Sequence, residues 1–394
     1  MDKREIVLCH AARTPIGAFN GALRSVPAAS LGATAIRATL HRSGLDRETV
    51  GSVVMGNVVQ AGARMNPARQ AALGGGLPVS APAMTINRVC GSGAQAIVSA
   101  AQQVACGEID CAIAGGLENM DCAPYLLDHA RWGYRMGAAK VLDSMLHDGL
   151  EDAFSGQHSG WHAEDLVTYA QLSRHDQDVF AERSQKRFCA AQRAGKFEDE
   201  IAPVEVKAKG GVELFDRDEA PRADTSLEAL SRLRPAFREN GTITAGNAPG
   251  LNSGAAAMIV ADEAFAEKRS LNPMARLAGY AISAVEPGMY GLAPVPAIHG
   301  ALARAGWNLG EVDRFEINEA FAAVALAIMR ELGLPDDVVN VEGGAIAHGH
   351  PIGATGAILT TRLMHAMRRD DLRRGVVALC IGGGMGIALA LEAL

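Results

Sequence analysis

The chain has 394 residues, of which 48% are hydrophobic and 21% charged, and its formal net charge is −7. This length exceeds what one hydrophobic core usually spans, so we expect two or three cooperating units. A net negative charge is not typical of proteins that bind nucleic acid or an anionic membrane, so neither is expected as a partner.

The N-terminal segment is charged and runs directly into a short apolar strand, with no apolar run long enough for a signal peptide or a membrane span. Seven cysteines are scattered along the chain without C-x-x-C spacing: Cys9, Cys90, Cys106, Cys111, Cys122, Cys189 and Cys380. This pattern is typical of reduced thiols and not of a disulfide framework or a zinc site. We therefore expect a soluble, cytoplasmic protein.

Cys90 lies at a predicted turn from a strand to a helix. The strand is expected to end near Ile86, and Gly91 and Gly93 allow a tight turn into a helix that begins near Ala94. A thiol there faces the positive end of the helix dipole, which predicts a lowered pKa, and the free amides of the turn suit an oxyanion. A small buried side chain with no chemistry is an equally good interpretation of this fragment.

The segment 121–250 differs from the rest in composition, because it holds 11 of the 18 aromatic residues. Within it, the stretch 172–197 is predicted to be helical, with Ser173 as N-cap and Gly195 as the stop. We interpret the segment as a lid inserted over the core, since such lids often close on long ligands.

A strand is predicted to end at Ile317, and Asn318 and Glu319 separate it from an alanine-rich helix. Taken alone, this fragment favours a structural interpretation. Asn318 would be the N-cap of the helix, and Glu319 a first-turn acid that compensates the helix dipole.

The segment 343–356 is crowded with glycine, so that backbone can approach a ligand, and His350 stands at its apex before Pro351. A capping histidine without chemistry is the alternative. His348 and His350 have H-x-H spacing, but no acidic or third histidine ligand lies nearby in the sequence, which disfavours a metal pair.

Cys380 ends a predicted apolar strand and is followed by a glycine-rich turn and another strand. The glycines leave free amides and space beside the thiol. A buried, inert cysteine is the alternative.

The chain is predicted to contain an internal duplication. Segment 40–57 resembles 302–318, 87–97 resembles 348–358, and 109–116 resembles 377–384, in the same order along the chain. The first pair is predicted to form a helix end, a glycine stop and a strand in both copies. Alternating strands and helices imply two α/β halves, stacked as similar sheets with helices between and around them.

Together these segments resemble the thiolase family over essentially the whole chain. The motifs that carry the resemblance are RTPIG (13–17), NPARQ (66–70), NRVCGSG (87–93), GGLENM (115–120), NEAFA (318–322), GGAIAHGHPIGATG (343–356) and CIGGGMG (380–386). Related ketosynthases typically place histidine where Cys380 stands, so two cysteines and one GHP histidine favour a thiolase.

The resemblance implies a duplicated core of five layers, α/β/α/β/α, with an inserted loop domain, in a homodimer or homotetramer. The expected domains are an N-terminal half at 1–120, whose last elements resume near 245–270, a CoA-binding loop domain at 121–250 and a C-terminal half at 251–394.

The resemblance also implies the role of each catalytic residue. Cys90, activated by His350, attacks the 3-keto carbon of a 3-oxoacyl-CoA, and the amides of Cys90 and Gly382 hold the oxyanion. Cys380 donates a proton to the departing acetyl-CoA enolate, whose oxygen is held by His350 and a water positioned by Asn318. CoA is a substrate, and no metal or redox cofactor is needed, because covalent catalysis divides one hard displacement into two steps.

The residues implied to contact CoA and the acyl group are His158, Ser159, Arg222, Ala248 and Pro249. Ser159 and Tyr290 stand where the family often has methionines that line the acyl pocket, which predicts an acyl group that is longer than acetoacetyl or has a polar end. Pro249 stands at a position that is often serine; it keeps a carbonyl but lacks an amide donor.

Two further interpretations remain open. One is a condensing enzyme of the ketosynthase type, and the other is a non-catalytic acyl-CoA or lipid carrier on the same fold. Cys380 argues against the first, and the presence of two positioned thiols argues against the second.

Overall fold

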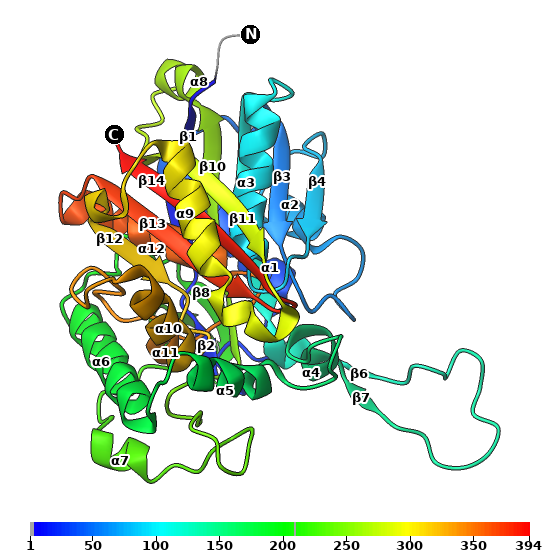
Figure 1. Ribbon diagram of the computed structural model, residues 1–394. Coiled ribbons are helices and arrows are strands. Elements are labelled where there is room, and N and C mark those ends of the chain that lie inside the picture. Colours follow the sequence, from blue (N-terminus) through cyan, green and yellow to red (C-terminus); the bar gives the residue numbers. More distant parts are fainter. Residues whose placement is uncertain (1–3, 209) are drawn as a thin grey trace.

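The computed structural model describes residues 4–208 and 210–394, and its centre is one mixed sheet (Figure 1). The main strand order is β12-β13-β14-β11-β1-β10-β5-β3-β4, and β2 pairs with β10. The strands are β1 (Ile6–Arg13), β2 (Gly17–Ala18), β3 (Ser52–Gly56), β4 (Ala83–Ile86), β5 (Cys111–Asn119), β10 (Asn252–Asp262), β11 (Ala275–Ala284), β12 (Arg314–Ile317), β13 (Arg374–Ile381) and β14 (Met385–Ala393).

The duplication is visible in the order of elements. The unit β1-α1-β3-α3-β5-β10 recurs as β11-α9-β12-α12-β13-β14, and the two copies join where β1 and β11 pair antiparallel. The repeated helices are α1 (Ala28–Ser43), α3 (Ser92–Ala105), α9 (Pro294–Ala305) and α12 (Thr355–Arg369). Gly44 and Gly306 end α1 and α9 in the left-handed conformation, with φ of 63° and 73°. The predicted helix, glycine stop and strand are thus confirmed in both copies.

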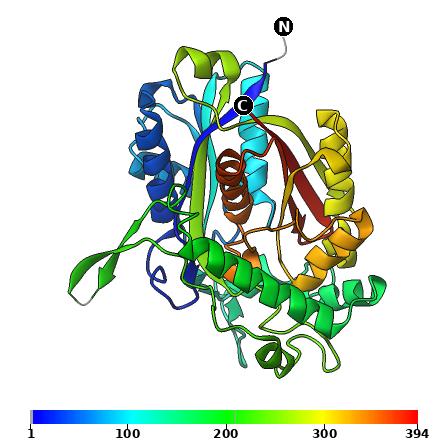
Figure 2. The same cartoon turned by 90° about the vertical axis from the view of Figure 1, so that its left-hand side faces the viewer.

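The core has five layers, as predicted (Figure 2). α3 and α12 pack against each other between the two halves of the sheet. On the outer face of the first half lie α1 and α2 (Pro67–Gly74), and α9 and α10 (Ala322–Leu332) cover the second half. β5 and β10 are buried along almost their whole length, which accounts for their small and apolar residues.

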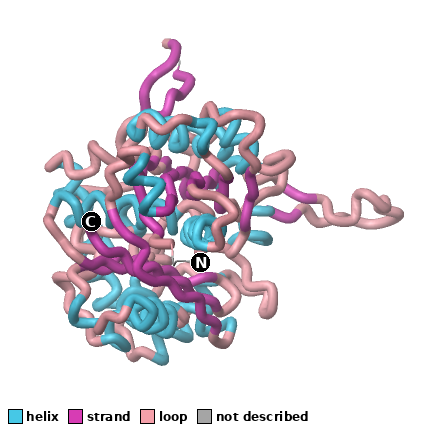
Figure 3. Tube along the Cα trace, turned by 90° about the horizontal axis from the view of Figure 1, so that it is seen from above, coloured by secondary structure: helices cyan, strands magenta, loops and turns pink. Residues whose placement is uncertain are grey.

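Among its described residues, the segment between β5 and β10 contributes two small β-ribbons and four α-helices. The ribbons are β6–β7 (Tyr125–Leu126 and Leu142–Asp143) and β8–β9 (Val204–Ala208 and Gly211–Phe215), and both stand away from the body in Figure 3. The helices are α4 (Ser144–Gly149), α5 (Ser159–Tyr169), α6 (Arg174–Arg193) and α7 (Leu227–Ser231).

The ends of α6 are those predicted. Ser173 and Asp176 form a reciprocal capping box at its start, and Gly195, with φ of 70°, follows its last turn. α5 and α6 pack on α10 and α11 (Ala345–His348), which places them over the second half. β10 pairs with β1 and β5, so the chain returns to the first half directly after this segment. It continues through α8 (Glu263–Lys268) into β11.

Within residues 4–208 and 210–394, no helix is long and apolar enough to cross a membrane. All seven cysteines are free thiols.

Candidate active site

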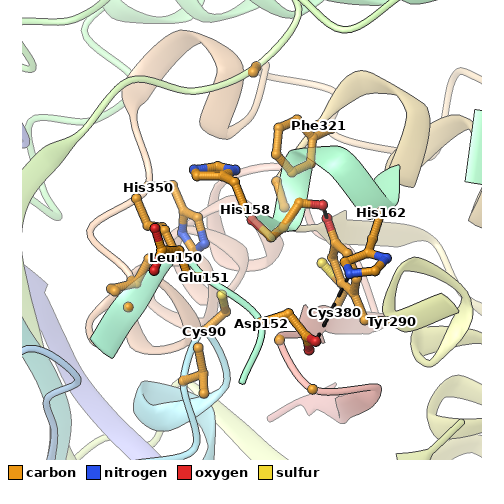
Figure 4. Close-up of a pocket in the computed structure, with 18 of the residues that line it drawn as sticks. Cys90, Leu150, Glu151, Asp152, His158, His162, Tyr290, Phe321, His350 and Cys380 are labelled. Carbon is orange, nitrogen blue, oxygen red and sulfur yellow. Dashed lines mark hydrogen bonds and ion pairs between the residues drawn. The ribbon is translucent and has the colours of Figure 1, made fainter. Parts of the chain in front are cut away.

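A cavity of about 390 Å³ lies where the two halves and the inserted segment meet (Figure 4). The first half contributes Cys90, and the second half contributes His350, Cys380 and Gly382. The inserted segment adds one wall, which includes Leu150, His158, Ser159, Phe237, Ala248 and Pro249. One cavity therefore brings together most of the residues that the sequence singled out.

Two of the sequence-predicted residues do not line this cavity. Asn318 lies behind His350, which it contacts through its side chain. Arg222 is exposed on the connection between β9 and α7, where its backbone amide donates to Gln185. Contact of Arg222 with CoA stays a prediction.

The turn that carries Cys90 is tightly constrained. β4 ends at Ile86 as predicted, but α3 begins at Ser92, two residues before Ala94. Val89, directly before the thiol, has a φ of 43°, a conformation that costs energy in a β-branched residue and occurs mainly at functional turns. Gly91 has no room for a side chain, because an added Cβ would lie 2.4 Å from Cδ1 of Ile381.

The pKa of Cys90 is raised, and the sequence-based expectation of a lowered pKa is wrong. The backbone amides of Gly382 and of Cys90 itself lower the pKa by hydrogen bonding to the sulfur, as a helix start predicts. Burial outweighs them and raises the pKa to about 11. Although Cys90 is partly exposed to the cavity, the surrounding protein disfavours the thiolate.

His350 is fixed by side-chain and backbone hydrogen bonds. Its Nδ1 lies 2.7 Å from Oγ1 of Thr355, and its Nε2 lies 3.3 Å from Nδ2 of Asn318. The backbone amide of His350 donates to Oδ1 of Asn252 at 2.9 Å. Burial lowers the pKa of His350 to about 4, so the imidazole is neutral near pH 7.

The interpretation of Asn318 as an N-cap and of Glu319 as a first-turn acid is wrong. α10 begins at Ala322, so neither residue is in its first turn or caps it. The carboxylate of Glu319 instead accepts hydrogen bonds from Ser184, Asn340 and the backbone of Ile346. Glu319 thereby connects the end of β12 to α6 and to α11, which precedes His350.

Cys380 is buried at the end of β13, directly before the turn at Gly382. Burial raises its pKa well above the usual value, and a negative charge on Cys90 raises it further. Burial raises the pKa of Tyr290 well above its usual value, and negative charge on Cys380 or Cys90 raises it further. Its hydroxyl donates to the backbone oxygen of Ser159 at 3.2 Å, so Tyr290 connects this wall to the start of α5.

His158 lines the cavity, and its neutral imidazole can donate a hydrogen bond there. Burial lowers its pKa, its Nδ1 accepts the amide of Gly160 at 3.0 Å, and its ring stacks on Phe237. Because Nδ1 accepts, the proton of the neutral ring lies on Nε2.

His348 does not share the surroundings of His350. Its ring is buried against Phe188, with 5.4 Å between ring centroids, and burial lowers its pKa well below the usual value. In the part of the chain that the structure describes, no group of three metal-binding side chains is present.

Three residues next to the site were missed by sequence reasoning: Glu118, Asn252 and Thr355. Glu118 is completely buried and accepts the amides of Val58, Val59 and Gly353, which joins the loops beneath Cys90 and His350. Burial raises its pKa to about 8. Glu118 and Thr355 lie within recognised motifs, but no local signal separates them from structural residues.

The neutral state of both Cys90 and His350 leads to a testable pH dependence. We expect the alkylation rate of Cys90 by iodoacetamide in the free protein to rise about tenfold per pH unit between pH 7 and 10, because only the thiolate reacts and its fraction grows as the pKa is approached. Peptide mass spectrometry would assign the label. A plateau beginning near neutral pH would instead indicate a thiolate–imidazolium pair.

The comparisons with known proteins agree over the full chain. Residues 6–264 match the model of the thiolase N-terminal domain, and residues 271–393 match that of the thiolase C-terminal domain. A Pseudomonas aeruginosa protein named acetyl-CoA acetyltransferase is 50% identical over 98% of this chain and 99% of its own length. A Staphylococcus aureus protein named probable acetyl-CoA acyltransferase is 48% identical over 98% of each chain.

Solved structures show the same fold. The crystal structure of the Bacillus anthracis acetyl-CoA acetyltransferase has a TM-score of 0.97 and 41% identity, covering 100% of this chain and 99% of that one. Human mitochondrial 3-ketoacyl-CoA thiolase has a TM-score of 0.96 and 42% identity, covering 99% of each chain.

Proposed function

The chain belongs to the thiolase family, and we propose that it cleaves 3-oxoacyl-CoA with CoA, or runs the reverse Claisen condensation, through an acyl-Cys90 intermediate. It is an acyltransferase. The observation that carries the mechanism is one cavity lined by two thiols and an imidazole, namely Cys90, Cys380 and His350. The test is loss of the 3-oxoacyl-CoA enolate absorbance when CoA is added; an unchanged absorbance would contradict the proposal.

In the proposed cleavage, Nε2 of His350 accepts the thiol proton of Cys90 while the sulfur bonds to the 3-keto carbon. The amides of Cys90 and Gly382 hold the resulting oxyanion, and their position at the Cys90 sulfur supports this role. As the oxyanion collapses, the C2–C3 bond breaks and its electron pair moves to C2. Cys380 then donates its proton to C2, and acetyl-CoA leaves.

The second half of the reaction restores the enzyme. The thiol of CoA gives its proton to the Cys380 thiolate and takes the acyl group from Cys90. The Cys90 sulfur leaves with the proton held by His350. During cleavage, His350 and a water on Asn318 stabilise the thioester oxygen of the enolate. Covalent catalysis and two thiol proton carriers account for every step, so the proposed reaction uses no metal or redox cofactor.

CoA is proposed to enter along the wall formed by the inserted segment. Ala248 and Pro249 line this wall beside Phe237 and Phe321, and His158 offers its Nε2 proton there. Apolar surfaces with a few polar groups suit a pantetheine arm. Pro249 offers only a carbonyl at this point.

Ser159 and Tyr290 are proposed to determine which acyl group fits. Both line the cavity, and the hydrogen bond between the Tyr290 hydroxyl and the Ser159 backbone holds the ring in place. The hydroxyl groups support an acyl group with a polar end, and a serine in place of a bulkier methionine supports one longer than acetoacetyl.

This assignment predicts a change of specificity on substitution. Ser159→Met combined with Tyr290→Met should shift the relative kcat/KM among 3-oxoacyl-CoA substrates, on the scale of the roughly 1–3 kcal/mol that one methylene discriminates in an apolar pocket. A kinetic panel of chain lengths and of acyl groups with polar ends would measure the shift. Identical specificity profiles for the double variant and the parent would show that both residues have only a structural role.

We also propose a homo-oligomer in the cytoplasm, as a dimer or tetramer. The excursion between β6 and β7 extends far from the body in Figure 1 and exposes Trp132 and Met136 to 79% and 96%. Exposed apolar groups of this size favour burial against a second copy. Light scattering on the purified protein would give the oligomeric state.

A further inference from the structure

The imidazole of His350 contacts one side-chain partner on each nitrogen. Nδ1 lies 2.7 Å from Oγ1 of Thr355, and Nε2 lies 3.3 Å from Nδ2 of Asn318. Since burial keeps the ring neutral near pH 7, only one nitrogen carries a proton. Whether His350 can accept a proton from Cys90 depends on which nitrogen that is.

The contact with Thr355 assigns the proton to Nδ1. The Thr355 hydroxyl has a single hydrogen, and Oγ1 donates it to the backbone oxygen of Pro351 at 2.9 Å. Toward His350 the same oxygen therefore offers only a lone pair. A short contact between Oγ1 and Nδ1 then requires Nδ1 to be the donor.

The contact with Asn318 fits the same assignment. Nδ2 of an asparagine side chain is a donor only, so Nε2 of His350 must accept from it. Both contacts thus describe the same tautomer, with the proton on Nδ1 and a lone pair on Nε2.

We propose that Thr355 is a positioning residue for the reaction, which holds His350 in the Nδ1–H tautomer so that the lone pair that can take the proton of Cys90 lies on Nε2. The proposal deepens the proposed function and rests on it. In the other tautomer Nε2 already carries a proton and accepts none from the thiol. The buried hydroxyl of Thr355 takes the part that a carboxylate plays in a Ser-His-Asp triad.

The same hydrogen bond also serves the next step. When Nε2 takes the thiol proton, the ring becomes an imidazolium with two N–H groups. The Nδ1–H group still donates to Oγ1 of Thr355, whereas the protonated Nε2 no longer accepts from Asn318 and can donate to the thioester oxygen. The proton that Nε2 later returns to the Cys90 sulfur is the one it took from the thiol, so the reaction gains and loses no proton.

The fold holds Thr355 rigidly in this place. It is the first residue of α12 and is completely buried, and its backbone amide donates to Pro351 at 3.0 Å. The next residue, Gly356, packs so closely on α3 that an added Cβ would lie 2.4 Å from the backbone nitrogen of Ala94. The starts of α12 and α3 are therefore in contact, and α3 follows the Cys90 turn.

The test compares Thr355→Val, which keeps the branched shape but removes the hydroxyl, with Thr355→Ser, which keeps the hydroxyl. Thr361→Val is a matched control, because Thr361 is buried in the same helix and donates to Ala357 at 2.9 Å. We expect kcat/KM for thiolysis to fall by about 10- to 100-fold in Thr355→Val, by analogy with the loss seen when the hydrogen-bond partner of a metal-bound histidine is removed. Thr355→Ser should restore most of the activity, and Thr361→Val should leave it unchanged.

A direct measurement of the tautomer separates positioning from folding. In protein labelled with ¹⁵N-histidine, the His350 signals, assigned with a His350→Gln variant, should show a protonated Nδ1 and an unprotonated Nε2 in the parent. In Thr355→Val the other tautomer should become populated. A protonated Nε2 in the parent, or unchanged activity and signals in Thr355→Val, would overturn the proposal. Because this measurement needs no substrate, it stands even where the enzyme shows no thiolysis, an outcome that would refute only the proposed function.

Discussion

Cys90→Ala is expected to abolish both thiolysis and condensation. Removing a covalent nucleophile typically costs on the order of 10⁶-fold in turnover, because no neighbouring group replaces the covalent path. The cavity offers Cys380 as a second thiol, but it is completely buried, and burial raises its pKa well above the usual value. We therefore expect no rescue by Cys380.

Acetyl-CoA provides the direct measurement. After treatment of the parent with acetyl-CoA, peptide mass spectrometry should find the acetyl group on Cys90, and the Cys90→Ala variant should remain unmodified. Cys106→Ala, a change of an exposed thiol at the end of α3, is the control and should behave like the parent. Acetylation of Cys380 with Cys90 unmodified would overturn the assignment.

The fold was predictable from local signals and from the duplication. The caps of α6 at Ser173 and Gly195, and the strand ends at Ile86 and Ile317, are fixed by residues close to them in the sequence. Helix caps and glycine stops act over one turn, so they can be recognised without knowledge of the tertiary structure. The duplication then predicted that the second copy repeats the first.

What the sequence could not predict depends on distant partners. Glu319 resembles a first-turn acid until Ser184 and Asn340 are seen to bind it. The pKa of Cys90 was predicted from the nearby helix start, but the burial that dominates it comes from elements of both halves. A helix dipole is a local property, whereas desolvation depends on everything that packs around the thiol.

The catalytic residues themselves were named from motifs, and the cavity places Cys90, His350 and Cys380 together. Their assigned roles stay predictions until the variants are measured. The role of Thr355 could not be predicted from the sequence, because a threonine at the start of a helix is ordinarily a structural residue. Only its contacts with Nδ1 of His350 and the oxygen of Pro351 distinguish it.

Cys380→Ser is expected to leave acylation of Cys90 intact and to remove most of the carbon–carbon bond turnover. A serine hydroxyl titrates far too high to exchange protons with C2 efficiently, and general acid–base catalysis contributes about 10²- to 10⁴-fold, so turnover should fall within this range. Acetyl-Cys90 should still form and be detected by mass spectrometry, while exchange of the C2 protons of acetyl-CoA in D₂O should fall together with turnover. Cys111→Ser makes the same change at a buried thiol of β5 and should affect stability without affecting exchange. If acylation collapsed while exchange of the C2 protons persisted, Cys380 would not be the acid and base of the reaction.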